Sequence, residues 1–314
     1  MQATLKHMVT FEGVGLHSGA PVRLALLPAV PDHGIRFRRT DLPGQPEVAA
    51  LWSNVTPSKL CTLLDDGQGT TVSTIEHVMA ALAGTGLHNV LVEIDGPEMP
   101  ILDGSSAPFV AGILGTGIAL QDAPLRAIRV LRPVEIREGE AFARLEPADH
   151  LSIDFAIDFT DAAIGHQEMR LDMANGAFLR ELADSRTFCR AADIEVMRRN
   201  GLALGGTFLN AVVVDGARVL SPGGLRHADE AVRHKMLDAV GDLALAGAPL
   251  LAKYTGHRAG HAMTNRLLRA LFADPTAWTW EVASADLETR LPGAGVAAYG
   301  VHAGIPMPMI LAAE

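Results

Sequence analysis

The sequence has 314 residues, of which 48% are hydrophobic and 20% charged, and its formal net charge is −10. This balance is typical of a folded globular protein and excludes a disordered chain. The negative charge argues against a nucleic-acid partner, so any anionic ligand must be held by a few placed cations.

The first third of the chain alternates short strand-like runs with glycine and proline. Strands are predicted at PVRLALLPA (21–29), GIRFRRT (34–40) and NVLVEID (89–95). Between them, STIEHVMAALAG (73–84) predicts an amphipathic helix, with Ser73 as its N-cap and Gly84 just past its last apolar turn.

The polar, proline-bearing run at 121–124 is the best linker candidate, and it predicts two domains, 1–124 and 125–314. After it, strands are predicted at 127–136, 142–147, 151–159 and 210–216, and helices at 176–184, 192–200, 229–245 and 260–271. Strands grouped with helices, without strict alternation, favour an α+β fold.

Two isolated cysteines, Cys61 and Cys189, argue for a reducing compartment, and the N-terminus shows no apolar signal region. The longest weakly polar stretch, 107–120, is too short to span a bilayer. We therefore expect a cytoplasmic protein that is not an integral membrane protein.

The predicted helix at 229–245 carries a polar stripe. Its members recur at four-residue steps on one face: Glu230, His234, Asp238 and Asp242. Most polar stripes are solvated faces, but a histidine and an aspartate four residues apart can also bind one metal ion.

The helix at 73–84 offers a third ligand, His77, next to Glu76. Each has a structural alternative, because Ser73 and Glu76 fit a capping box and a lone helical histidine is often a core residue. Together, however, the two helices supply two histidines, an aspartate and a glutamate, the set that a catalytic zinc with an open position requires.

His261 is predicted to begin a helix, whose positive end lowers the pKa of a histidine unless a carboxylate compensates. Asp242, one turn beyond Asp238, is the candidate partner. The glycine-rich run GVGLHSG (13–19) lacks the spacing and the βαβ context of a dinucleotide site.

Six sequence motifs make the functional interpretation more specific than the candidate zinc ligands alone. GVGLHSG, STIEHVMAALAG, PILDGSSAPFV, SRTF, VRHKMLDAVGDLALAG and GHAMTN resemble, in order and spacing, the UDP-3-O-acyl-N-acetylglucosamine deacetylases of lipid A synthesis. The resemblance runs from about residue 3 to residue 272 and leaves about the last forty residues without support.

The resemblance implies a fold of two similar domains, each a β-sheet with two helices, packed as a β-α-α-β sandwich. It implies one catalytic Zn²⁺ per chain, for which Fe²⁺ could substitute, held by His77, His234 and Asp238. By the same matching, Glu76 would be the general base and Thr187 a donor to the oxyanion. His261, oriented by Asp242, would be the general acid or an electrostatic stabiliser.

The substrate implied is a UDP-sugar with one acyl chain, bound by a monomer. Phe188 would pack on the sugar, Phe159 on uracil, Lys235 would contact substrate, and Arg258 would stand near the diphosphate. Six residues match positions that line an apolar acyl passage: Leu16, Ile194, Gly206, Thr207, Ala211 and Val213.

Some positions depart from the family pattern. Cys189 and Arg190 follow SRTF where glycine and an apolar residue are usual, and His88 replaces an aspartate. Two other functions stay open at this point: a zinc hydrolase acting on another amide, and a non-catalytic metal-binding protein.

Overall fold

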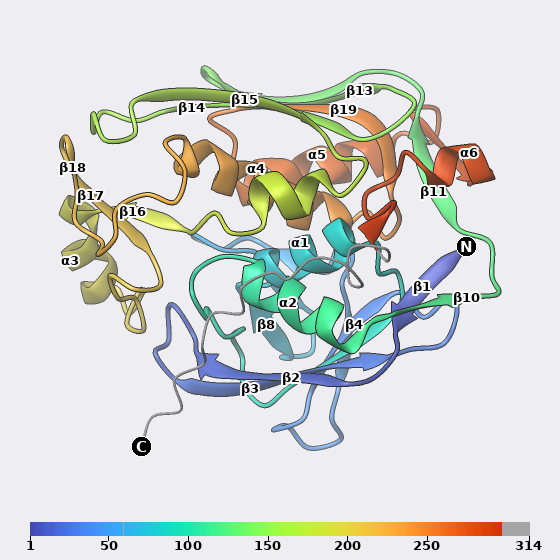
Figure 1. Ribbon diagram of the computed structural model, residues 1–314, viewed down its shortest axis with the longest axis horizontal. Helices are drawn as coiled ribbons and strands as arrows, with labels where there is room; N and C mark the ends of the chain where they lie inside the picture. Colours follow the sequence, from blue (N-terminus) through green and yellow to red (C-terminus); the bar gives the residue numbers. More distant parts are fainter. Residues whose placement is uncertain (59, 297–314) are drawn as a thin grey trace.

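The computed structural model describes residues 1–58 and 60–296. Two β-sheet layers enclose a central layer of helices, so that α4 and α5 lie beneath one sheet and α1 and α2 lie above the other (Figure 1). This arrangement confirms the α+β sandwich that the resemblance implied.

The lower layer is a five-stranded sheet in the order β2-β3-β9-β4-β5. Along β3, Val22, Leu24 and Leu26 are buried and alternate with more exposed residues, so one face packs on the helices. The strands are β2 (Val9–Val14), β3 (Pro21–Pro28), β9 (Val90–Ile94), β4 (Ile35–Arg39) and β5 (Glu47–Ala49).

The upper layer is a seven-stranded sheet built around β19 (Leu250–His257), which pairs with β11, β13 and β14. The sequence patterns do not predict β15, β19 or β20, although all three belong to this sheet. Its other strands are β11 (Arg126–Val130), β12 (Val134–Glu138), β13 (Ala141–Pro147), β14 (Ser152–Asp158), β15 (His166–Asp172) and β20 (Trp278–Val282).

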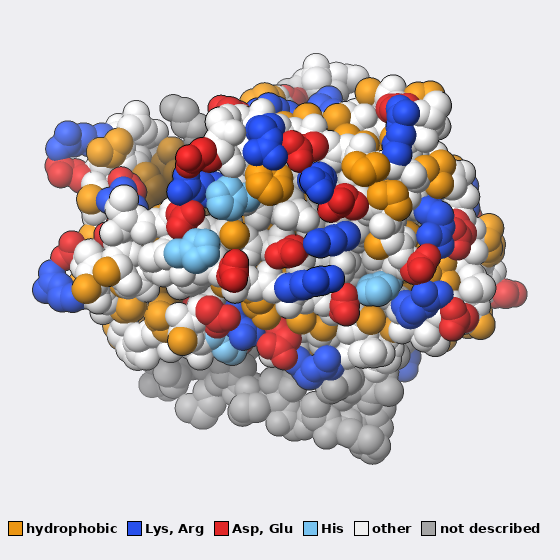
Figure 2. Space-filling view, turned by 90° about the horizontal axis from the view of Figure 1, so that it is seen from above, with side chains coloured by type: hydrophobic (Ala, Val, Ile, Leu, Met, Phe, Trp, Pro, Cys, Tyr) orange, Lys and Arg blue, Asp and Glu red, His pale blue; other side chains and the backbone are white. Residues whose placement is uncertain are grey.

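The outer face of this sheet mixes cations and carboxylates without a broad field of one sign (Figure 2). Nζ of Lys253 lies 3.4 Å from Oδ2 of Asp154, and Nη2 of Arg144 lies 3.1 Å from Oε1 of Glu146. Binding of an anion therefore depends on individual side chains and not on a charged surface.

Smaller elements complete the fold. β1 (Gln2–Leu5) pairs with β10 (Ile118–Gln121), and residues 122–125 lead from β10 into β11. The boundary at 124 stays a prediction. The remaining elements are η1 (Trp52–Asn54), β6 (Val55–Thr56), β7 (Leu63–Asp65), β8 (Thr71–Ser73), η2 (Phe178–Leu182), β16 (Phe188–Arg190), α3 (Ala191–Arg199), β17 (Val212–Asp215), β18 (Arg218–Val219) and α6 (Ala285–Glu288).

The central helices are α1 (Glu76–Thr85), α2 (Ala107–Thr116), α4 (Glu230–Ala244) and α5 (His261–Ala273). The predicted ends of α1 were wrong. Ser73 lies in β8, where its backbone N–H donates to the Pro97 carbonyl, and the helix ends at Gly86 in the left-handed conformation with φ 75°.

Gly84 of α1 and Gly241 of α4, each seven residues after a histidine, lie in close contact with neighbouring elements. A Cβ at Gly241 would lie 2.1 Å from the carbonyl oxygen of Glu76, and one at Gly84 would lie 2.1 Å from the Phe178 ring. The two helices therefore pack with backbone against backbone at Gly241. No helix in the described part of the chain is both long and apolar enough to cross a bilayer.

Candidate metal centre and active site

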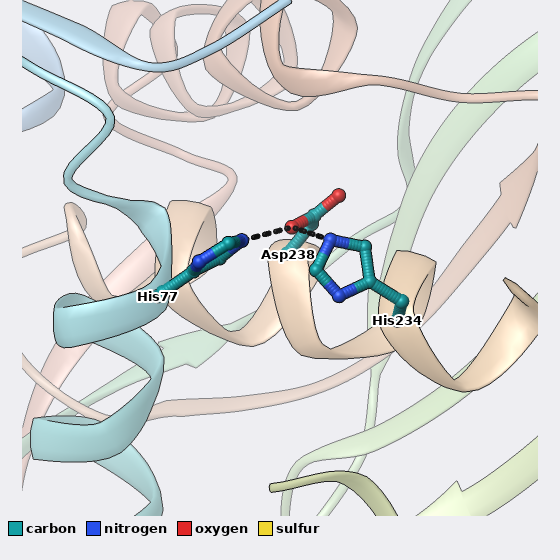
Figure 3. A group of neighbouring side chains, drawn as sticks. All are labelled: His77, His234 and Asp238. Carbon is teal, nitrogen blue, oxygen red and sulfur yellow. Dashed lines mark ion pairs between the residues drawn. The ribbon is translucent and has the colours of Figure 1, made fainter. Parts of the chain in front are cut away.

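Three buried side chains from two helices converge in the central layer (Figure 3). Oδ1 of Asp238 lies 3.8 Å from Nε2 of His77 and 3.3 Å from Nε2 of His234. One potential ligand atom from each residue lies within 4.8 Å of the others. The polar stripe on α4 is thus buried, and its interpretation as a solvated face was wrong.

The donor set fits a divalent cation. Oδ1 of Asp238 is buried and has no hydrogen-bond partner among the residues that the structure describes, a costly state for a carboxylate that a cation would relieve. Burial lowers the pKa of His77 to about 3 and also lowers the pKa of His234, so both rings are neutral, which is the form that ligates metals.

The orientation of His234 is set by the SRTF region. Its Nδ1 donates to the carbonyl oxygen of Ser185 at 3.0 Å, which leaves Nε2 free to face Asp238. Lys235 lies beside the same carboxylate, and its Nζ donates to Oδ2 of Asp238 at 2.7 Å.

Glu76 is the first residue of α1, but it is not part of a capping box. Its Oε2 accepts from the backbone N–H of Thr62 at 3.0 Å, and its Oε1 lies 3.8 Å from Nε2 of His261. Burial, together with the charges of Asp238 and Asp242, raises the pKa of Glu76 to about 7 although His261 opposes the shift.

His261 begins α5, and its Nδ1 lies 2.8 Å from Oδ2 of Asp242. Burial acts to lower the pKa of His261, but the carboxylates of Asp242, Glu76 and Asp238 outweigh it and raise that pKa to about 9. The site therefore contains a carboxyl and an imidazole with pKa values that favour proton transfer near neutral pH.

The fourth member of the stripe, Glu230, lies outside this group. It forms a buried ion pair with Arg186, in which Nε and Oε1 are 2.8 Å apart. This pair anchors the loop that carries Thr187, whose backbone N–H donates to the carbonyl of Gly104 at 2.8 Å.

The aromatic residues predicted to bind substrate lie close to the three candidate metal ligands His77, His234 and Asp238, here called the metal group. The ring of Phe188 lies 6.2 Å from that of His234 and 5.4 Å from that of Phe159, edge to face in both cases. Together they form a row of rings that begins at a candidate metal ligand.

Arg258 directly follows the last residue of β19, and its guanidinium pairs with two carboxylates. Its Nη1 is 2.6 Å from Oε2 of Glu140, and its Nη2 is 3.1 Å from Oδ2 of Asp158. A ligand phosphate would have to compete with these contacts.

The residues expected to line an acyl passage belong to two regions. Leu16 follows β2 and approaches Gly206, where a Cβ would lie 3.6 Å from Leu16 Cδ1. Ile194 lies on α3, Thr207 is exposed, and Ala211 and Val213 are buried at β17. The surface beside them exposes several large apolar side chains: Val196, Leu204, Phe208 and Leu209.

The three positions that depart from the family pattern, Cys189, Arg190 and His88, make local structural contacts. Burial raises the pKa of the Cys189 thiol to about 11, and Arg190 pairs with Asp161. His88 is half-buried, and loss of solvation lowers its pKa to about 4, while its Nδ1 accepts from the backbone N–H of Ala3 at 3.0 Å.

A cavity of about 260 Å³ lies at the far ends of α1 and α4. Leu87, Leu243 and Trp280 are among its lining residues, and none of the predicted metal, catalytic or substrate-binding residues lines it. It is therefore separate from the predicted site.

Sequence reasoning missed Thr62. It contacts both Glu76 and Asp242, through its backbone N–H and its hydroxyl respectively. A threonine in the run LCTLL has no spacing or composition that could have revealed this position.

The family model described as LpxC, UDP-3-O-acyl N-acetylglycosamine deacetylase, matches residues 2–273. The chain belongs to this deacetylase family. Its membership and the group His77, His234 and Asp238 together indicate a metalloenzyme with a possible metal site on α1 and α4.

Several relatives carry the name UDP-3-O-acyl-N-acetylglucosamine deacetylase. The protein from Phenylobacterium zucineum is 48% identical over 91% of this chain and 98% of its own length. Those from Shewanella pealeana and Acidithiobacillus ferrooxidans are 43% and 47% identical, over 93% and 88% of this chain and 95% and 91% of their own lengths.

Proposed function

We propose that this chain hydrolyses the acetamide of UDP-3-O-acyl-N-acetylglucosamine to the free amine and acetate, the committed step of lipid A biosynthesis. The observation that carries the proposal is the buried group of His77, His234 and Asp238, with Glu76 and His261 beside it. Family membership and the names of the relatives supply the substrate.

We assign one Zn²⁺ to the three ligands, since two histidines and one carboxylate suit a catalytic zinc, and Fe²⁺ would suit the same donors. When bound, the cation supplies Lewis-acid polarisation of the amide carbonyl and lowers the pKa of water at the site.

Glu76 accepts the proton of the attacking water, because its Oε1 is the carboxylate oxygen that faces His261 and the site. His261 donates a proton from Nε2 to the nitrogen of the breaking C–N bond, because an unprotonated amide anion is a very poor leaving group. Asp242 holds the opposite ring nitrogen. The hydroxyl of Thr187 donates to the developing oxyanion.

For the substrate, we assign the sugar to Phe188, uracil to Phe159 and a polar contact to Lys235. The row of rings from His234 through Phe188 to Phe159 supports an extended UDP-sugar that starts at the scissile acetamide. Arg258 contacts the diphosphate after its guanidinium has separated from Glu140 or Asp158. The acyl chain follows the passage between Leu16 and the β17 region.

We further propose that the chain acts as a cytoplasmic monomer with domains at 1–124 and 125–314. In that division α1 and α4 belong to different domains, so each domain supplies part of the metal site.

Acetate release from UDP-3-O-acyl-N-acetylglucosamine tests the function directly. The purified chain should release acetate, lose activity with a chelator and regain it with Zn²⁺. Comparable kcat/KM on a non-nucleotide acetamide would indicate a different amide hydrolase, and metal binding without any hydrolysis would indicate a non-catalytic protein.

A further inference from the structure

Thr62 connects the two catalytic helices from a segment outside both of them. It lies between β6 and β7, and 3% of it is exposed. Its backbone N–H donates to Oε2 of Glu76 on α1 at 3.0 Å. Its hydroxyl donates to Oδ1 of Asp242 on α4 at 2.6 Å.

Each of these carboxylates uses its other oxygen toward His261. Oε1 of Glu76 lies 3.8 Å from Nε2, and Oδ2 of Asp242 lies 2.8 Å from Nδ1. The contacts therefore close a ring of four residues: Thr62, Glu76, His261 and Asp242. Within this ring, each carboxylate oxygen of Glu76 and Asp242 faces either Thr62 or His261.

We infer that Thr62 is a positioning residue for the reaction, an inference that rests on the proposed function. By occupying Oε2, its N–H leaves Oε1 as the oxygen of Glu76 that accepts the proton. By holding Asp242, its hydroxyl keeps Oδ2 on Nδ1 of His261, which places the transferable proton on Nε2.

The structural alternative is that Thr62 only satisfies buried polar groups. Both roles predict some loss of stability when the hydroxyl is removed. Only the positioning role predicts a loss of turnover that depends on His261.

The Thr62→Val substitution keeps the shape of the side chain and the backbone N–H but removes the hydroxyl. We expect kcat for acetate release to fall by on the order of 10- to 100-fold, because a small misplacement of a catalytic group strongly lowers the rate of the chemical step. KM should change less than about twofold and metal content should not change, whereas Thr62→Ser should restore kcat to within about threefold of wild type.

Thr85→Val is the matched control. Thr85 is equally buried and lies on α1, and within the described part of the chain its hydroxyl donates to the backbone carbonyls of Ala81 and Leu82 and to no catalytic side chain. This variant should retain wild-type kcat. If Thr62→Val does not fold, as judged by a thermal melt, Thr62→Ala removes the same hydroxyl and takes its place.

The deciding comparison repeats the Thr62 substitution in a His261→Ala background. There the hydroxyl has no imidazole to orient, so its removal should cost less than about twofold. An equal fold-loss in both backgrounds, wild-type kcat in Thr62→Val, or failure of Thr62→Ser to restore kcat would overturn the inference. A wild-type chain that releases no acetate would instead overturn the proposed function, and the inference with it.

Discussion

Gly241 of α4 lies directly against Glu76 of α1, with room for a hydrogen atom but not for a methyl group. A Cβ at position 241 would be 2.1 Å from the Glu76 carbonyl oxygen, which is backbone and cannot rotate away. This contact sets how close the two helices that carry the metal group can come.

We therefore expect Gly241→Ala to lower the free energy of unfolding by on the order of 1–3 kcal/mol, the usual cost of overpacking a core. It should also lower kcat, since Glu76 and His77 move with α1. Urea unfolding and acetate release measure the two effects. Gly115→Ala in α2, where a Cβ meets nothing within 4 Å, is the control and should be neutral or slightly stabilising.

The metal assignment predicts that alanine at His77, His234 or Asp238 abolishes both metal binding and activity. Elemental analysis should find one ion per chain in the wild type and a loss in each variant. His227→Ala is a suitable control because that ring pairs with Asp184 and is not one of the three clustered ligands. Stoichiometric metal retained in His234→Ala would contradict the ligand assignment.

The roles of Glu76 and His261 predict a different outcome. Glu76→Gln and His261→Ala should lower kcat by roughly 10²–10⁴, the range typical of general acid–base catalysis, while metal stays bound. Single-turnover kinetics with elemental analysis measures both quantities. Near-normal turnover in Glu76→Gln would mean that another group is the base.

The pH profile of kcat/KM should be bell-shaped. Glu76 must be deprotonated to act, so activity rises as the pH passes its pKa, raised to about 7 mainly by burial. His261 must be protonated, so activity falls as the pH passes its pKa, raised to about 9 by the surrounding carboxylates against the effect of burial. A bound cation shifts both limbs of the profile to lower pH. Because Glu76 and His261 influence each other's protonation, each limb reports an apparent pKa of the interacting residues and not that of one residue alone.

His261→Gln should remove the alkaline limb of that profile and leave the acid limb. An unchanged alkaline limb in this variant would assign the limb to another residue.

The acyl passage predicts that the fatty chain matters although it is remote from the scissile bond. Each buried CH₂ contributes roughly 0.8 kcal/mol, so UDP-N-acetylglucosamine should have a kcat/KM lower by on the order of 10³. Ala211→Trp should impair the acylated substrate alone, whereas Val30→Trp, at an exposed position that is not part of the predicted passage, should impair neither. Thermal melts separate this effect from unfolding, and equal kcat/KM for the two substrates would remove the lipid A assignment.

Most of the helices and the polar stripe of α4 could be predicted because both depend on local periodicity, whereas α2 was not predicted as a helix. α4 and α5 begin and end within two residues of the expected positions, and His234 and Asp238 are one turn apart on any helix. The convergence of His77 with them was inferred because His77 completes a ligand set, and the family resemblance supported that inference, since α1 and α4 are far apart in the sequence.

Long-range contacts explain what the sequence did not show. Ser73 has the chemistry of an N-cap, but its backbone is engaged by Pro97 in a strand-like segment. β19 was missed because its first three residues are buried without alternation. Thr62 acquires its role only when the chain between β6 and β7 reaches both helices.

Under the proposed ligand assignment, the placement of ligands on both α1 and α4 links metal supply to the stability of the fold. An ion held by both helices braces the centre of the sandwich, and its binding free energy adds to folding in proportion to the logarithm of its free concentration. At 100 times the dissociation constant this amounts to about 2.7 kcal/mol. A cell short of the metal would thus hold fewer active sites and also a more labile protein, so the abundance of the enzyme would follow the metal even with synthesis unchanged.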